Sequence, residues 1–176
     1  MKAISGSKLV TSLLIGLIGV ILLLIFPLPC TVNGQSGDIN TPAHNKAIIK
    51  QGFDNWAHNT GSFFDLLADN VQWTITGSTP FSKTYTNKKQ FMDEVINPLN
   101  DRLSKRIVPT ITNIYADGDE VIVLWDGKAT AADGKPYNAA YSWNMQLKNG
   151  KIIKVVAFLD GIEFADIMSR IPIRNN

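Results

Sequence analysis

The sequence predicts one small α+β domain behind an apolar leader, with helices first and a hairpin-connected sheet afterwards. Up to about residue 103 the apolar residues recur at helical spacing, and from Ile107 onward they alternate with a period of two. Turn sequences at Gly118, Gly134 and Gly150 divide this second part into strands. Because helices that precede such a meander cover only one of its faces, we expect a cone-shaped, curled antiparallel sheet covered on one face by the N-terminal helices, with a cavity between them.

Residues 1–34 have the layout of an export segment. Lys2 and Lys8 precede residues 9–26, an uncharged run of 18 residues rich in Leu, Ile, Val and Gly, and a stretch with Pro, Gly and Ser follows. As a helix this run would span about 27 Å, so a retained membrane anchor is the alternative to a cleaved signal peptide. Small residues favour cleavage before Gln35, whereas Cys30 leaves lipid attachment as a third alternative. We expect an exported protein, periplasmic or extracellular, that touches membrane only through this segment.

Composition excludes several classes of function. Removing Lys2 and Lys8 from the 17 basic residues leaves 15, which equals the 15 acidic residues, so the remaining chain is formally neutral and no nucleic-acid partner is expected. One cysteine and two histidines, His44 and His58, form no metal-binding array. We therefore expect neither a metal nor another cofactor.

The predicted helices lie in the first half of the domain, which spans residues 41–176 after a polar linker at 35–40. Thr41 can cap a helix that starts at Pro42 and ends near residues 59–61. A short helix at 63–68, a strand at 71–76 and a loop at 78–85 follow. A third helix then begins at Thr86 or Asn87, and Pro98 should kink or split it.

The second half should form strands at about 107–116, 120–131, 136–148 and 151–160, and a last helix at 162–171. Their short connections favour antiparallel hairpins. In the third strand, aromatic and aliphatic residues share one face and polar residues share the other, so one face should be buried. The expected buried residues of this strand are Tyr137, Ala139, Tyr141, Trp143, Met145 and Leu147.

Four passages, in this order, resemble the SnoaL-like branch of the ketosteroid-isomerase and nuclear-transport-factor-2-like superfamily, and the resemblance covers residues 43–168. They are Leu66–Trp73, Asp119–Trp125, Asp133–Asn138 and Asn149–Ile153, the last leading to Phe158–Asp160. The resemblance implies a nuclear transport factor 2-like fold in a bacterial protein, and a homodimer paired through the open face of the sheet. It does not define the activity, because isomerases, cyclases, epoxide hydrolases, dehydratases and non-catalytic modules share this superfamily.

The residues at the expected catalytic positions differ from those that the resemblance to ketosteroid isomerase implies. The place of that enzyme's aspartate base falls near Ile75 and Thr76, and the place of its buried acid falls at Trp143. Steroid-type isomerisation is therefore disfavoured. Asp160 matches the aspartate that ends the closing strand in SnoaL-like sequences, where a polyketide cyclase uses it as a general acid and base. The structural alternative is that Asp160 caps the helix that follows.

Two further groups are candidates for the site. His58, at the end of the first helix, could partner an acid, although a histidine at a helix C-terminus also interacts favourably with the helix dipole. Aromatic residues facing the interior could line a hydrophobic pocket, or serve only as core. The expected lining residues are Trp56, Trp73, Trp125, Tyr141 and Trp143, with Tyr85 as a further aromatic candidate. We interpret Lys88, Lys89, Lys105 and Arg106 as solvated surface charge.

Two functional hypotheses follow. The preferred one is an exported SnoaL-like domain that binds a small hydrophobic ligand in its cone cavity. The alternative is a metal-independent lyase, isomerase or hydrolase that uses Asp160 as general acid and base, with His58 as the second candidate catalytic residue.

Overall fold

Helix α1 (Pro42–His58) begins the part of the chain that the computed structural model describes, residues 41–172. The predicted leader at 1–34 and linker at 35–40 lie outside the described residues. The hydroxyl of Thr41 accepts a hydrogen bond of 3.2 Å from the backbone N–H of His44, and Pro42 occupies the first turn, where a missing N–H costs nothing. Asn59 ends the helix in the left-handed conformation, with φ 59°. Both ends of α1 therefore lie where the sequence predicted them.

The next segment contains one short helix and two strands. The 3₁₀ turn η1 (Phe63–Leu66) is capped by Ser62, and strand β1 (Leu67–Ile75) follows directly. A two-residue strand, β2 (Thr84–Tyr85), pairs antiparallel with the end of β1. This strand lies in the stretch predicted to be a loop, and it is too short to produce a recognisable alternation in the sequence.

The third predicted helix is one continuous helical run with an irregular middle. It consists of α2 (Lys88–Phe91), the π turn η2 (Met92–Ile96) and α3 (Asn97–Asn100). Pro98 does not split the run. Because Pro98 has no N–H, the carbonyl of Glu94 four residues earlier has no α-helical donor. Glu94 lies in the π turn η2, directly before α3.

A curled, unclosed sheet of six strands carries the rest of the fold. Its long strands are β3 (Leu103–Asp117), β4 (Glu120–Ala131), β5 (Pro136–Lys148) and β6 (Lys151–Leu159), joined by tight turns as predicted. The strand order is β2-β1-β6-β5-β4-β3, and these four neighbours pair antiparallel. Register shifts interrupt the β3–β4 ladder, which bends the sheet.

One pair departs from the expected antiparallel pairing, because β1 and β6 run parallel. The two strands are far apart in sequence, with α2, η2, α3 and three long strands between them. No tight turn fixes their relative direction, so the crossover alone decides it. The sheet is therefore mixed at this pair and antiparallel elsewhere.

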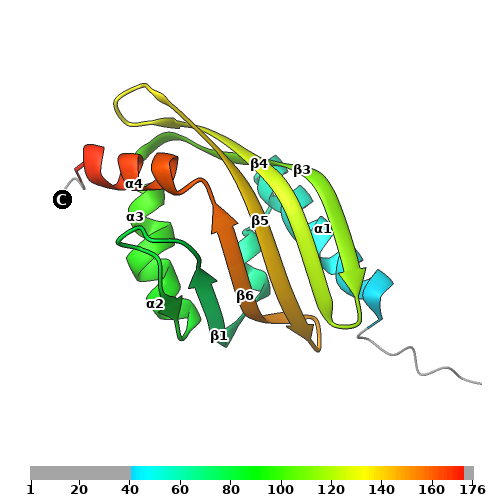
Figure 1. Cartoon of the computed structure of the whole chain (residues 1–176). Helices are drawn as coiled ribbons and strands as arrows, with labels where there is room; N and C mark the ends of the chain where they lie inside the picture. The colour runs from blue at the N-terminus through cyan, green and yellow to red at the C-terminus, as the bar shows by residue number, and fades with distance from the viewer. Residues whose placement is uncertain (1–40, 173–176) are drawn as a thin grey trace, which may run out of the picture. The chain divides into compact units, whose positions relative to one another are not determined.

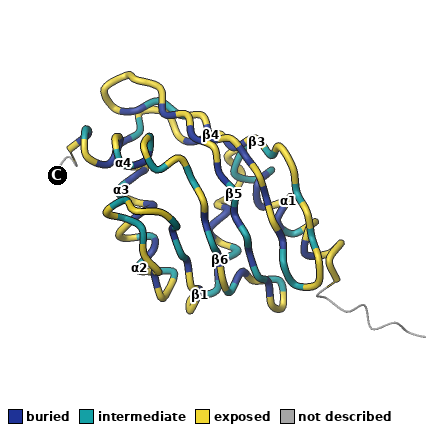
Figure 2. Tube along the Cα trace, viewed as in Figure 1, coloured by how far each residue is buried: buried dark blue, intermediate teal, exposed yellow. Residues whose placement is uncertain are grey.

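The helices cover one face of this sheet. Helix α1 packs on β3 and β4, α2 packs on β1, and the last helix, α4 (Gly161–Arg170), contacts β5 and α3. In Figure 1, α1 lies behind β3 and β4. Helices α2, α3 and α4 lie together toward the opposite edge of the sheet. Burial alternates along the strands (Figure 2), and all six residues predicted for the inner face of β5 are buried. None of the helices in the described residues is long and apolar enough to span a membrane.

Candidate functional site

An aromatic cavity lies between the helices and the inner face of the sheet. The five side chains predicted to line a pocket all border it, and they come from α1, β1, β4 and β5. They are Trp56, Trp73, Trp125, Tyr141 and Trp143. Inward positions of neighbouring strands face the same layer, which explains how residues distant in sequence meet here.

The rings hold one another in fixed geometries. Trp125 stacks on Tyr141 with 3.9 Å between ring centroids, and Trp73 stacks on Phe91 at 4.1 Å. Trp143 stands edge-on between these two stacks, 4.8 Å from Trp125 and 5.0 Å from Trp73. Such offset and edge-to-face contacts stabilise aromatic clusters beyond their buried area. The cavity wall is therefore formed by mutually packed aromatic rings.

The hollow expected from the sequence is largely filled by these rings. The cavity has a volume of about 50 Å³, whereas pockets for small molecules have roughly 300–1,000 Å³. A groove of about 480 Å³ adjoins it, at the end of α1 and beside α3 and the start of β3. Cavity and groove share Trp56, Phe64, Ile96, Asn100 and Ile107. The cavity is narrow and the groove is wide, and the two lie on either side of these shared side chains.

Three polar groups lie in or beside the otherwise apolar lining: the side chain of Asn100, the hydroxyl pair of Tyr137 and Tyr141, and the indole N–H of Trp125. The hydroxyls of Tyr137 and Tyr141 share a hydrogen bond of 2.9 Å, and the Nε1–H of the buried Trp125 has no acceptor among the described residues. Burial raises the pKa of Tyr137 to about 12 and raises that of Tyr141 well above its ordinary value. Both phenols stay protonated at neutral pH, and the pair retains one O–H that is not used between the two rings.

The two candidate catalytic residues lie away from the cavity lining. Asp160 is exposed and caps α4, because its carboxylate accepts hydrogen bonds of 3.2 Å from the backbone N–H groups of Ile162 and Glu163. His58 is exposed at the end of α1, and its Nδ1–H donates to the carbonyl of Asp54 at 2.8 Å. The residues that line the cavity include no carboxylate and no histidine.

Arg106 is an exposed charge, as the sequence indicated, but it also makes contacts within the fold. It lines the groove, and its guanidinium reaches the C-terminal end of α1, where Nη1 donates to the carbonyl of Trp56 and Nη2 to that of Ala57, both at 2.8 Å. The carbonyl of Trp56 also accepts the backbone N–H of Asn59 at 3.2 Å, so Arg106 adds side-chain donors to the end of the helix. The groove thus holds a positively charged group whose position is fixed by the backbone.

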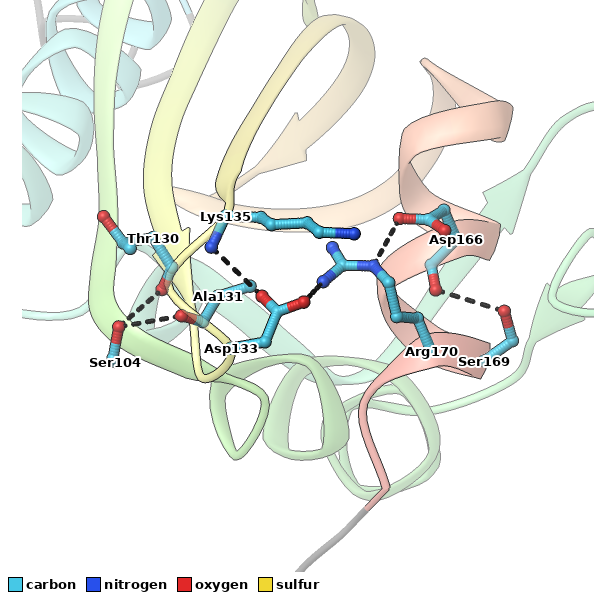
Figure 3. A network of polar contacts seen from close by, with 8 residues as sticks. All are labelled: Ser104, Thr130, Ala131, Asp133, Lys135, Asp166, Ser169 and Arg170. Carbon is cyan, nitrogen blue, oxygen red and sulfur yellow. Dashed lines mark hydrogen bonds and ion pairs between the residues drawn. The ribbon is translucent and has the colours of Figure 1, made fainter.

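Helix α4 supplies part of the wall and is tied to the β4–β5 hairpin. Phe164 lines the cavity and packs edge-on against Phe81, 5.2 Å away. At the other end of the helix, Arg170 forms ion pairs with Asp133 of the hairpin and with Asp166 one turn earlier (Figure 3). The hairpin therefore anchors the helix that carries Phe164.

Tyr85, the further aromatic candidate, does not line the cavity. Tyr85 is buried outside the cavity lining, and its hydroxyl donates to the carbonyl of Phe81 at 2.9 Å, so it serves the core. Within residues 41–172, no group of three or more His, Cys, Asp or Glu side chains is placed to hold a metal ion.

Several lining residues were not singled out from the sequence. They include Phe64 of η1, Phe91 of α2 and Phe164 of α4. Their positions on the apolar faces of helices were visible, but helical periodicity does not reveal which core residue borders a cavity. Arg106 and Asn100 gave no sequence signal for the groove, because only the tertiary fold brings α3 and β3 beside the end of α1.

The fold and the cavity define the class of protein as a small α+β cone of the nuclear transport factor 2-like kind. The sequence model of the SnoaL-like domain matches residues 50–155, and the chain belongs to this family. Among curated proteins, none matches this chain significantly.

Solved structures agree with this fold. A nuclear transport factor 2-like protein from Burkholderia thailandensis E264 is 18% identical, with a TM-score of 0.59 over 71% of this chain and 97% of that one. A protein provisionally called an isomerase, from Bacillus subtilis, is 15% identical, with a TM-score of 0.61 over 76% and 99%. A protein provisionally called a SnoaL-like polyketide cyclase, from Jannaschia sp. CCS1, is 15% identical, with a TM-score of 0.58 over 74% and 95%. At these identities the similarity establishes the fold alone.

Proposed function

We propose that this SnoaL-like domain binds a small, mainly apolar molecule that carries a hydrogen-bond-accepting oxygen. The ligand occupies the groove at the end of α1 and extends into the aromatic cavity. Rigid aromatic walls with a few polar groups are typical of small-molecule sites, and the volume of the groove lies within the usual range for them.

The observation that carries this proposal is the indole N–H of Trp125. Trp125 is 2% exposed, and its Nε1 has no acceptor among the residues that the structure describes. Buried donors are almost always paired, since leaving one unpaired costs free energy. A ligand oxygen beside Trp125 would accept this hydrogen bond. The free O–H of the Tyr137 and Tyr141 pair is a second donor for the same oxygen.

Catalysis by Asp160 is the weaker hypothesis on this geometry. A general acid or base acts within hydrogen-bond reach of the reacting atom. The carboxylate of Asp160 is instead bonded to two backbone N–H groups of α4 and does not border the cavity. The capping role weighed from the sequence accounts for both of these bonds. We therefore propose binding, and an acid–base activity would need another group.

Tryptophan emission tests the binding proposal directly, because all four tryptophans of the chain border the cavity. The probe is 2-octanone, which carries one carbonyl acceptor and absorbs only weakly in the tryptophan range, so a correction for inner-filter absorption suffices. We expect a saturable emission change with the wild-type protein and weaker binding by Trp125→Phe, which removes the N–H and keeps an aromatic ring. Tyr115→Phe, on an exposed position of β3, is the control. Equal affinities in all three proteins would contradict the proposal.

A homodimer is the proposed assembly, supported by apolar side chains on the sheet face that no helix covers. The register places Leu124 of β4, Ser142 of β5 and Phe158 of β6 in one row, and Tyr115 pairs with Ile122 beside it. Phe158 is 55% exposed and Tyr115 is 56% exposed. Such contiguous apolar surface is a mark of protein interfaces. Size-exclusion chromatography with light scattering tests this, and a monomer at micromolar concentration would count against it.

Export through residues 1–34 is proposed from the sequence pattern. N-terminal sequencing and mass measurement of the protein recovered from an expressing bacterium test it. A chain that begins at Gln35 supports a cleaved signal peptide, a full-length chain in the membrane fraction supports the anchor, and a full-length chain in the cytoplasm contradicts export.

A further inference from the structure

The groove beside the aromatic cavity contains one formally charged side chain, that of Arg106. Its other lining residues are apolar or neutral, and no carboxylate is among them. They are Trp56, Asn59, Gly61, Ser62, Phe64, Met92, Ile96, Asn100, Leu103 and Ile107. The neighbouring cation Arg102 is paired elsewhere, since it donates to the carbonyls of Pro98 and Met168. The groove therefore offers its occupant a positive charge without a compensating acid in its wall.

The guanidinium of Arg106 is held so that part of it stays unused. Nη1 donates to the carbonyls of Trp56 and Ile107, and Nη2 donates to that of Ala57. These three bonds use three of the five N–H donors of an arginine, which leaves Nε–H and one Nη2–H. Adjacent N–H groups on one edge of a guanidinium match the two oxygens of a carboxylate.

We propose that Arg106 binds the acidic head group of the ligand, a carboxylate, at the outer end of the site. This inference rests on the proposed function, and it adds the ligand class: a small amphipathic acid with an apolar body. The carboxylate lies at Arg106, and the apolar body passes Trp56 and Ile107, which border both groove and cavity. An oxygen at its far end reaches Trp125. A neutral groove wall of Asn59, Ser62 and Asn100 completes the polar rim.

The experiment compares two probes that differ only at the head group. The probe 7-oxooctanoate carries a carboxylate at one end and a ketone near the other, and 2-octanone has a methyl group in place of that carboxylate. The full chain is kept in zwitterionic lipid bicelles, which contain no tryptophan. Binding is followed by tryptophan emission, and free probe is measured after ultrafiltration so that uptake by lipid does not enter the dissociation constant.

Two variants separate ligand recognition from the capping of α1. Arg106→Gln removes the charge and keeps an amide donor for the carbonyl of Trp56. Lys105→Gln is the matched control, because Lys105 is an adjacent, exposed cation that does not line the groove. A thermal unfolding curve for each variant confirms that it is folded at the temperature of the titration.

We expect the wild-type protein to bind 7-oxooctanoate about tenfold more tightly than 2-octanone. Arg106→Gln should lower the affinity for 7-oxooctanoate about tenfold more than it lowers that for 2-octanone, which abolishes the preference, whereas Lys105→Gln should retain the preference. A purely structural Arg106 would change both affinities together, and that result overturns the inference. Equal wild-type affinities for the two probes also overturn it while supporting the proposed function. Absence of binding by either probe contradicts both.

Discussion

The hydrogen bond between Tyr137 and Tyr141 allows a quantitative test of how the polar end of the cavity is built. Both hydroxyls are buried on the inner face of β5, four residues apart, with 2.9 Å between their oxygens. The perturbation is a double-mutant cycle with Tyr137→Phe, Tyr141→Phe and the double variant. Each single variant removes one hydroxyl and leaves its partner in the protein interior, whereas the double variant leaves neither.

The loss in free energy of unfolding expected for each single variant depends on how deeply the remaining hydroxyl is buried. Tyr137 is 1% exposed and does not line the cavity, so Tyr141→Phe leaves its hydroxyl without a partner at a cost of about 1–3 kcal/mol. Tyr141 is 9% exposed and lines the cavity, so its orphaned hydroxyl in Tyr137→Phe is closer to solvent and the cost should be about 1 kcal/mol. Replacing both partners by apolar groups of the same shape is nearly neutral. We therefore expect a coupling free energy of about 2–4 kcal/mol, the sum of the two single costs minus the nearly neutral double variant.

Urea unfolding followed by tryptophan emission measures all four free energies of unfolding. The order of stability should be wild type and double variant highest, then Tyr137→Phe, then Tyr141→Phe. The reasoning is refuted if the double variant is destabilised by the full sum of the single effects, because the two hydroxyls would then be independently solvated.

Three further predictions concern capping and pH. In thermal unfolding, Asp160→Ala should lower the stability of the fold by about 1 kcal/mol, whereas Asp160→Asn, which keeps an N-cap acceptor, should be nearly neutral. Any catalytic turnover that survives Asp160→Asn excludes the Asp160 carboxylate as general acid or base. Burial, and then the charge of Glu94, raise the pKa of Tyr85 to about 12. The buried, protonated phenol of Tyr85 therefore stabilises the fold fully below pH 10, and this stabilisation is lost as pH rises towards 12. Tyr85→Phe should reduce this alkaline loss of stability in melting curves recorded at different pH values. The hydrogen bond from Arg170 lowers the pKa of Asp133 below its ordinary value of 3.8. The ion pair therefore stabilises the fold above that pH, and this stabilisation is lost as pH falls through the lowered pKa. Asp133→Asn should make the melting temperature less dependent on pH in the acid range, and an unchanged dependence would contradict the pairing.

Much of the fold was predictable because its determinants are local. Thr41 and Pro42 mark the start of α1, and the glycine turns at 118, 134 and 150 separate the four long strands at nearly their observed ends. The alternation in β5 correctly assigned its inner face. The departures lie where local pattern carries no information, in the two-residue strand β2, the π turn before Pro98 and the parallel pairing of β1 with β6.

The candidate site was predictable only in part. Its aromatic wall was visible as apolar residues at inward strand positions. The volume of the cavity could not be predicted, because the space left between the rings depends on how Trp143 packs between Trp73 and Trp125. The two candidate catalytic residues, Asp160 and His58, were chosen by residue type and position along the chain, and the structure places both at exposed helix ends.

The sequence by itself determined the order of helices and strands, the inward set of aromatic residues and the balance of charge in the chain after residue 8. These properties depend on residue type and on spacing over a few positions. The tertiary structure alone decided that the cavity is narrow, that the N–H of Trp125 has no acceptor among residues 41–172 and that Arg106 lines a groove at the end of α1. Each of these depends on contacts between segments tens of residues apart, which the curl of the sheet and the crossover to β1 bring together.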